Sequence, residues 1–191
     1  TPVEATCSFR LNGKRPEIWD ALTGGIKYAD TYYDDASRLC VPLHFDPCGS
    51  LFVVFDRRCS WKTKPYGGVR DIKTRRTITS PWELSFSEEY DGVLDVIQID
   101  TLKDICTFAD PRIKYYSGPI SYHTVFEYQL SAKEQYLTLG DVLDVGITDV
   151  VLNGIELGTT WTKPFRYDVT GIVRNGENVL DVCVVNSWYN R

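Results

Sequence analysis

Adjacent carboxylates are the first residues in this sequence that could do chemistry, because acid–base catalysis of hydrolysis commonly uses a pair of carboxyl groups. The chain has 26 Asp and Glu residues, and Asp34-Asp35 and Glu88-Glu89 are neighbouring pairs. Both pairs lie in polar stretches that are typical of exposed turns. Such turns lack the apolar surroundings that prepare a general acid. We therefore assign no catalytic residue to this chain.

Other catalytic and metal-binding patterns are also missing from the sequence. There is no Gly-x-Ser-x-Gly motif and no phosphate-binding loop. The two histidines, His44 and His123, fall inside strand-like patterns, and the six cysteines include no Cys-x-x-Cys pair. We therefore expect no metal site of the zinc type and no cofactor. Four cysteines cluster in the first third and could form disulfides in an oxidising compartment, which leaves their redox state open: Cys7, Cys40, Cys48 and Cys59.

Composition and charge exclude several classes of partner. The formal net charge is −5, which argues against nucleic acid, because its binding depends on Lys and Arg that neutralise phosphates. No apolar run reaches the roughly 18 residues of a membrane-spanning helix. Because the chain contains no methionine and starts at Thr1, we expect it to be a piece of a longer polypeptide.

The elements that must position any site follow a two-residue period, which indicates β-strands. Apolar residues alternate with others over 39–45 and 122–128, and 51–55 and 179–185 are nearly continuous apolar runs. Asn-Gly pairs, which favour tight hairpin turns, punctuate the chain. The pattern predicts an all-β sandwich without any helix longer than about two turns. Turns of this kind are expected at Asn12-Gly13, Asn153-Gly154 and Asn175-Gly176.

The domain organisation is predicted from a change in composition near the middle of the chain. Residues 60–79 are basic, contain Pro and Gly and lack alternation, so we interpret them as a linker. Residues 1–59 would then form the C-terminal part of one β-sandwich, and 80–191 a complete second sandwich. We expect Trp19 and Trp82 to be core or domain-junction anchors. The expected core of the second sandwich comprises Phe126, Val151, Leu152, Leu180, Val182 and Val184.

Motifs in the second sandwich carry a resemblance to a known family. They are the segment Tyr116-Ser-Gly-Pro-Ile-Ser-Tyr122, the hairpin from Asp149 through Asn153-Gly154 to Gly158, and the tail from Asp168-Val-Thr to Gly176-Glu-Asn-Val-Leu180. In combination they resemble the sugar-binding domain of glycoside hydrolase family 2. The resemblance implies a galactose-binding-like jelly roll over about residues 80–191.

Two further segments extend the resemblance over nearly the whole chain. Pro16-Glu-Ile-Trp19-Asp20-Ala-Leu-Thr23-Gly24 and Val185-Asn-Ser-Trp188-Tyr-Asn190-Arg191 look like the C-terminal region of family 106-like enzymes, the α-L-rhamnosidase type. There a galactose-binding-like sandwich follows the end of another β-sandwich. These families place their catalytic carboxylates on a separate barrel domain. The resemblance thus implies a catalytic domain of the same polypeptide as partner, and a secreted or periplasmic location.

A carbohydrate site would need an aromatic face for the C–H groups of a pyranose and polar groups for its hydroxyls. The loops of the second sandwich contain both kinds of residue. The resemblance also leaves room for a structural calcium ion, although the Asp residues lack EF-hand spacing. The candidate sugar-binding residues are Tyr115, Tyr116, Trp161, Arg166, Trp188 and Asn190.

Three functions remain open at this point. The leading hypothesis is a non-catalytic accessory region of a polysaccharide-degrading glycoside hydrolase of the α-L-rhamnosidase or β-galactosidase type. This region would pack on the catalytic domain and line part of its sugar site. The alternatives are an independent carbohydrate-binding module and a structural interaction sandwich without sugar affinity. Because the motifs indicate a fold rather than a reaction, the sequence leaves the sugar and its linkage open.

Overall fold

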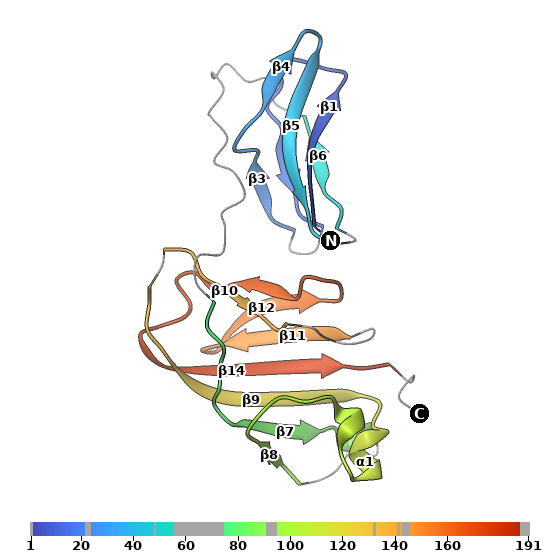
Figure 1. The fold of residues 1–191 in the computed structure, drawn as a ribbon, viewed down its shortest axis with the longest axis vertical. Helices are drawn as coiled ribbons and strands as arrows, with labels where there is room; N and C mark the ends of the chain where they lie inside the picture. The colour runs from blue at the N-terminus through green and yellow to red at the C-terminus, as the bar shows by residue number, and fades with distance from the viewer. Residues whose placement is uncertain are drawn as a thin grey trace. The chain divides into compact units, whose positions relative to one another are not determined.

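The computed structural model describes residues 2–21, 24–47, 49–55, 75–90, 95–131, 133–140, 142 and 146–187. The chain divides into two compact units, Thr1–Arg75 and Arg76–Arg191 (Figure 1). Both consist of antiparallel sheets, so the predicted all-β sandwich architecture is confirmed. Most of the expected linker at 60–79 lies outside the described residues, and its bounds stay a prediction.

The first unit contains two three-stranded sheets, in the orders β1-β5-β4 and β3-β2-β6. Their inner faces share a core formed by Ile18, Leu39, Val41 and Leu43. The alternation predicted from 39 to 45 thus turns Leu39, Val41 and Leu43 inward. The strands are β1 (Val3–Phe9), β2 (Glu17–Trp19), β3 (Ile26–Tyr28), β4 (Tyr33–Asp35), β5 (Arg38–Phe45) and β6 (Phe52–Val54).

The second unit is built on a six-stranded antiparallel sheet in the order β12-β11-β14-β9-β7-β8, with a separate pair β10-β13 (Figure 1). The long strands β9 and β14 lie side by side at its centre, and their register pairs Val182 with Tyr122. The strands are β7 (Trp82–Phe86), β8 (Ile97–Ile99), β9 (Pro119–Tyr128), β10 (Tyr136–Thr138), β11 (Ile147–Leu152), β12 (Ile155–Thr160), β13 (Arg166–Asp168) and β14 (Gly176–Val185).

The core of the second unit corrects one detail of the predicted set. Phe126, Leu152, Leu180 and Val182 are buried as expected, and Val184 is partly buried against the same cluster. Val151, however, is only partly buried and is not part of this cluster. On β11 the inward positions are Thr148, Val150 and Leu152, so Val150 takes the place that we had given to Val151. The expectation that Trp82 is a core residue is confirmed.

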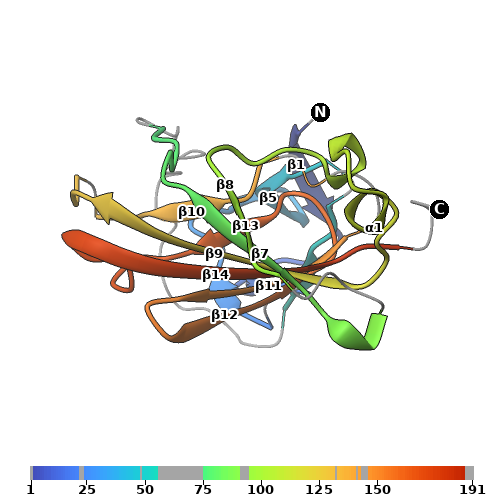
Figure 2. The same cartoon turned by 90° about the horizontal axis from the view of Figure 1, so that it is seen from below.

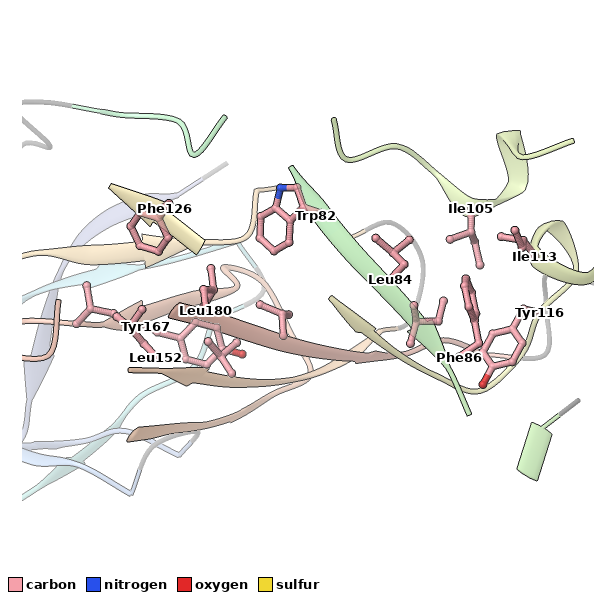
Figure 3. Packing of buried hydrophobic residues seen from close by; sticks show 14 of the residues in the cluster. Trp82, Leu84, Phe86, Ile105, Ile113, Tyr116, Phe126, Leu152, Tyr167 and Leu180 are labelled. Atoms are coloured by element: carbon pink, nitrogen blue, oxygen red, sulfur yellow. The ribbon is translucent and has the colours of Figure 1, made fainter. Parts of the chain in front are cut away.

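Short helical turns close one end of this sheet (Figure 2). They are η1 (Glu88–Tyr90), η2 (Ile105–Thr107) and α1 (Pro111–Lys114). Asp104 and Asp110 cap η2 and α1 by accepting hydrogen bonds from backbone N–H groups. Ile105 and Ile113 reach from these turns towards Phe86 and Tyr116 (Figure 3). In the described ranges no helix exceeds four residues, and none is long and apolar enough to cross a membrane.

Candidate functional site

The Asn-Gly hairpin between β11 and β12 is fastened by the side chain of its first residue. Asn153 has a positive φ of 53°, which asparagine tolerates better than most residues. Its Nδ2 donates to the Ile172 carbonyl at 3.0 Å and to Asn178 Oδ1 at 2.8 Å. Its Oδ1 accepts from the Val179 N–H at 3.0 Å. Asn153 therefore ties the hairpin to the turn that leads into β14.

Asn178 completes this fastening from inside the protein, where it has no solvent exposure. Its Oδ1 accepts from the Arg174 N–H at 2.8 Å, and its Nδ2 donates to the carbonyls of Arg174 and Gly176, both at 2.9 Å. A buried amide has few ways to satisfy its polar atoms, and here all are used within the protein. The two asparagines of the family-type motifs thus hold the fold together and are not available to a ligand.

A second clamp joins the segment before β9 to the end of β14. The Asn186 side chain accepts from the Gly118 N–H and donates to the Tyr116 carbonyl, both at 2.8 Å, and Ser117 Oγ donates to the Ser187 carbonyl at 3.0 Å. A Cβ added at Gly118 would lie 2.8 Å from Tyr90 Cγ, so only glycine fits there. The Ser-Gly motif is therefore also a structural feature.

The structure places Tyr116 in the core, which corrects its assignment as a candidate sugar-binding residue. It is 3% exposed, and its ring packs edge-on against Phe86 at a centroid distance of 5.0 Å (Figure 3). Its hydroxyl donates to the Pro119 carbonyl at 2.9 Å and accepts from the Ser87 N–H at 3.0 Å. Burial raises the pKa of this hydroxyl. The physical reason is that α1 ends just before Tyr116 and turns it towards β7.

Tyr115 and Trp161 are exposed, at 49% and 52%, and lie at the same end of the sheet. The strand register aligns Thr160 with Thr148, Val184 and Ile120 across four strands. Trp161 directly follows Thr160, whereas Tyr115 precedes the strand that contains Ile120. Three strand spacings, about 14 Å, separate these strands. The two rings therefore extend from segments that adjoin strands which are not neighbours in the sheet.

Arg166 lies on a different sheet, where its guanidinium is 5.7 Å from the ring centroid of Tyr136. Tyr136 is 54% exposed on β10 and was missed in the sequence, although the alternation over 136–138 could have indicated an outward ring. Arg166 and Tyr136 form an exposed cation–π pair, in which the guanidinium covers one side of the ring. The remaining candidates, Trp188 and Asn190, lie outside the described residues.

Each of the two histidines pairs with a carboxylate at the surface. His44 Nδ1 lies 2.5 Å from Glu4 Oε1, and His123 Nδ1 lies 2.6 Å from Asp181 Oδ1. The hydrogen bond to Glu4 raises the pKa of His44. The described part of the chain holds no cluster of three or more His, Cys, Asp or Glu side chains that could bind a metal. Its free cysteines are Cys7, Cys40, Cys106 and Cys183.

The architecture of this chain is similar to part of a solved glycoside hydrolase structure. The structure of a rhamnosidase from Novosphingobium sp. PP1Y superimposes on 100% of this chain with a TM-score of 0.88 and 29% identity. Over its whole length, the chain resembles one part of a rhamnosidase. The predicted resemblance to the α-L-rhamnosidase type of glycoside hydrolase is therefore confirmed. No protein-family model matches the chain.

A curated protein of Formosa agariphila, named "Putative beta-glucuronidase", is 34% identical over 95% of this chain. The chain spans only 17% of that protein and 18% of the rhamnosidase. Both relatives carry names of glycoside hydrolases, but the two names specify different sugars. The resemblance therefore identifies the architecture of this region and leaves its substrate to be determined.

Proposed function

We propose that this chain is a non-catalytic accessory region of a larger glycoside hydrolase of the rhamnosidase type. It would pack on a catalytic domain of the same polypeptide and help to line that domain's sugar site. The observation that carries this proposal is the match over the entire chain to 18% of the rhamnosidase. A secreted or periplasmic location and the galactose-binding-like jelly-roll form of the second unit are part of the same proposal.

The distribution of carboxylates supports a non-catalytic role. Glycoside hydrolysis needs two carboxyl groups about 5–10 Å apart on opposite sides of the scissile bond. Asp34 and Asp35 lie exposed on β4, and Glu88 and Glu89 lie exposed on η1. All four side chains are exposed, whereas a general acid needs apolar surroundings.

A second candidate function is an independent carbohydrate-binding module. It is favoured by the exposed ring of Trp161 and by the pair formed by Arg166 and Tyr136. A sugar ring could stack on either aromatic group while the guanidinium donates to its hydroxyls. The resemblance to galactose-binding-like sandwiches also leads us to propose a structural calcium ion.

The test compares residues 1–191 with the polypeptide encoded by the complete gene. Both are assayed with aryl α-L-rhamnoside, aryl β-D-glucuronide and aryl β-D-galactoside at equal molar concentration. The proposal expects turnover of one of these substrates by the complete polypeptide and none by residues 1–191. Turnover that scales with the concentration of residues 1–191 and disappears in Glu88→Gln or Asp34→Asn would overturn it.

A further inference from the structure

One face of the first unit exposes apolar side chains where an antiparallel sheet usually presents polar ones. Trp19 of β2 is aligned with Ile26 of β3 and with Phe52 of β6. Cross-strand partners point to the same side of a sheet, and these three are 39%, 59% and 62% exposed. Tyr28, two residues from Ile26 and therefore on the same side, is 37% exposed. We name these four side chains the aromatic face.

The opposite side of the same sheet already has a partner within the unit. Ile18, which lies between Glu17 and Trp19, is 5% exposed, and Val53 packs in the same cluster. The inward side of this sheet thus contributes its apolar side chains to the core of the first unit. The aromatic face is additional apolar surface that the fold of the first unit does not use.

The polar atoms next to the aromatic face are held by contacts within the unit. Trp19 Nε1 donates to Glu17 Oε2 at 3.1 Å, and Glu17 is itself buried. The Arg15 guanidinium lies 3.4 Å from the centroid of the Tyr28 ring. These contacts fix two of the three rings of the aromatic face before any partner arrives, which lowers the entropy cost of binding. They also satisfy the indole N–H, so Trp19 can be buried without losing a hydrogen bond.

The composition of this face fits a protein surface better than a sugar. A sugar site needs open ring faces with polar groups that converge on the hydroxyls. Here Arg15 occupies one side of Tyr28, and the most exposed positions include the aliphatic Ile26, which lies across Trp19 from Phe52. Aliphatic and aromatic side chains in one row instead match the apolar centre of a protein–protein interface.

The size of the aromatic face favours a domain of the same polypeptide over a second copy of the chain as its binding partner. A large side chain presents about 200 Å² when fully exposed, so the four side chains expose roughly 400 Å². This is within the range of functional patches but about half of the 800 Å² that each partner of a stable complex buries. A domain on the same polypeptide needs less, because the tether raises its effective concentration. In the rhamnosidase, a region like this chain accounts for only 18% of the polypeptide.

We propose that the aromatic face is the surface on which another domain of the same polypeptide docks. This inference rests on the proposed accessory function and assigns it a location on the outer face of the β3-β2-β6 sheet. The docked surface would be apolar and would cover Trp19, Ile26 and Phe52.

Hydroxyl-radical footprinting tests this inference, because it measures the accessibility of individual side chains. Trp19 and Phe52 should react about four-fold or more slowly in the polypeptide of the complete gene than in residues 1–191, because docking takes their exposed fractions from 39% and 62% to below one tenth. Tyr33, which is 46% exposed on β4, is the control and should react equally in both proteins.

A double variant, Ile26→Thr with Phe52→Thr, removes the apolar surface while keeping residues that favour strands. In the complete polypeptide it should abolish the protection of Trp19, whereas the matched variant Tyr33→Thr should leave that protection intact. Circular dichroism of residues 1–191 confirms that both variants fold.

Three outcomes would overturn the inference. Trp19 and Phe52 could react equally fast in both proteins, they could be protected in residues 1–191 only at concentrations where the chain dimerises, or they could be protected only after a glycan is added. If the complete polypeptide hydrolyses an aryl glycoside while Trp19 stays reactive, the docking surface is wrong and the proposed function stands. If Trp19 is protected but no glycoside is hydrolysed, the proposed function fails and the docking surface stands.

Discussion

At the scale of single residues, the asparagines of the motifs that carry the family resemblance stabilise the fold. Asn153 and Asn178 hydrogen-bond to each other and to backbone groups of the stretch 172–179. Asn186 joins the segment before β9 to the end of β14. A motif of this kind identifies an architecture because its side chains replace backbone partners that irregular turns lack. Such a motif does not indicate which ligand the protein binds.

Asn178→Ala should lower the free energy of unfolding of the second unit by about 2–4 kcal/mol. The change removes four hydrogen bonds that the buried Asn178 side chain makes with Asn153, Arg174 and Gly176, and each such bond contributes about 0.5–1.5 kcal/mol. Urea denaturation of residues 1–191 measures the effect. Glu177→Ala, at the exposed neighbouring position, is the control. Equal midpoints for Asn178→Ala and the parent chain would contradict this account.

His44 should titrate above the ordinary histidine pKa of about 6.5, because its hydrogen bond with Glu4 raises that pKa. A pKa that is higher in the folded state stabilises the protein fully below the unfolded pKa, and this contribution is lost as the pH rises through the folded pKa. The pair is on the surface, so the contribution should stay below about 1 kcal/mol. NMR titration of His44 in the parent and in Glu4→Gln checks this: the variant should titrate at a lower pH.

At the scale of elements, the two-residue period predicted the sandwich. It did not determine, for every strand, which residues face the core. On β11 the run Val150-Val151-Leu152 offers apolar residues on both faces, and a register shift against β12 falls between Val150 and Val151. Local alternation could not show which valine faces inward. The same limit applies to Tyr115 and Tyr116, whose orientation depends on the single helical turn of α1.

The two valines of β11 provide a matched test of the observed register. Val150, at 1% exposure, lies in the core, whereas Val151 does not. Val150→Asp should unfold the second unit, since burying an unpaired carboxylate costs several kcal/mol. Val151→Asp should be tolerated with a much smaller loss. Thermal melts monitored by near-UV circular dichroism compare them, and the reverse ranking would show that the register is wrong.

At the scale of the whole molecule, the aromatic face could not be predicted from the sequence, because it is built on short strands. Strands β2 and β3 have three residues each, too few for a periodic pattern to reveal two apolar sides, and only β6 lies in a continuous apolar run, 51–55. Only their pairing brings Trp19, Ile26 and Phe52 into one row. We had interpreted Trp19 as a core or junction anchor, and its exposure within the chain fits a junction better than a core.

The scattered positions of the exposed aromatic rings predict weak sugar binding by the isolated chain. Trp161 follows β12, Tyr115 precedes β9 and Tyr136 lies on β10, so we expect a monosaccharide to stack on one ring at a time. One stacked ring assisted by a single guanidinium, that of Arg166, should give a Kd weaker than about 1 mM, which corresponds to about 4 kcal/mol of binding free energy. NMR titrations with rhamnose, galactose and glucuronic acid measure it. Trp161→Ala should remove any shift perturbations near β12, while Tyr33→Ala, in the first unit, should leave them unchanged. A micromolar Kd that depends on Trp161 would instead favour an independent carbohydrate-binding module, because such a module must hold its ligand without help from a catalytic domain.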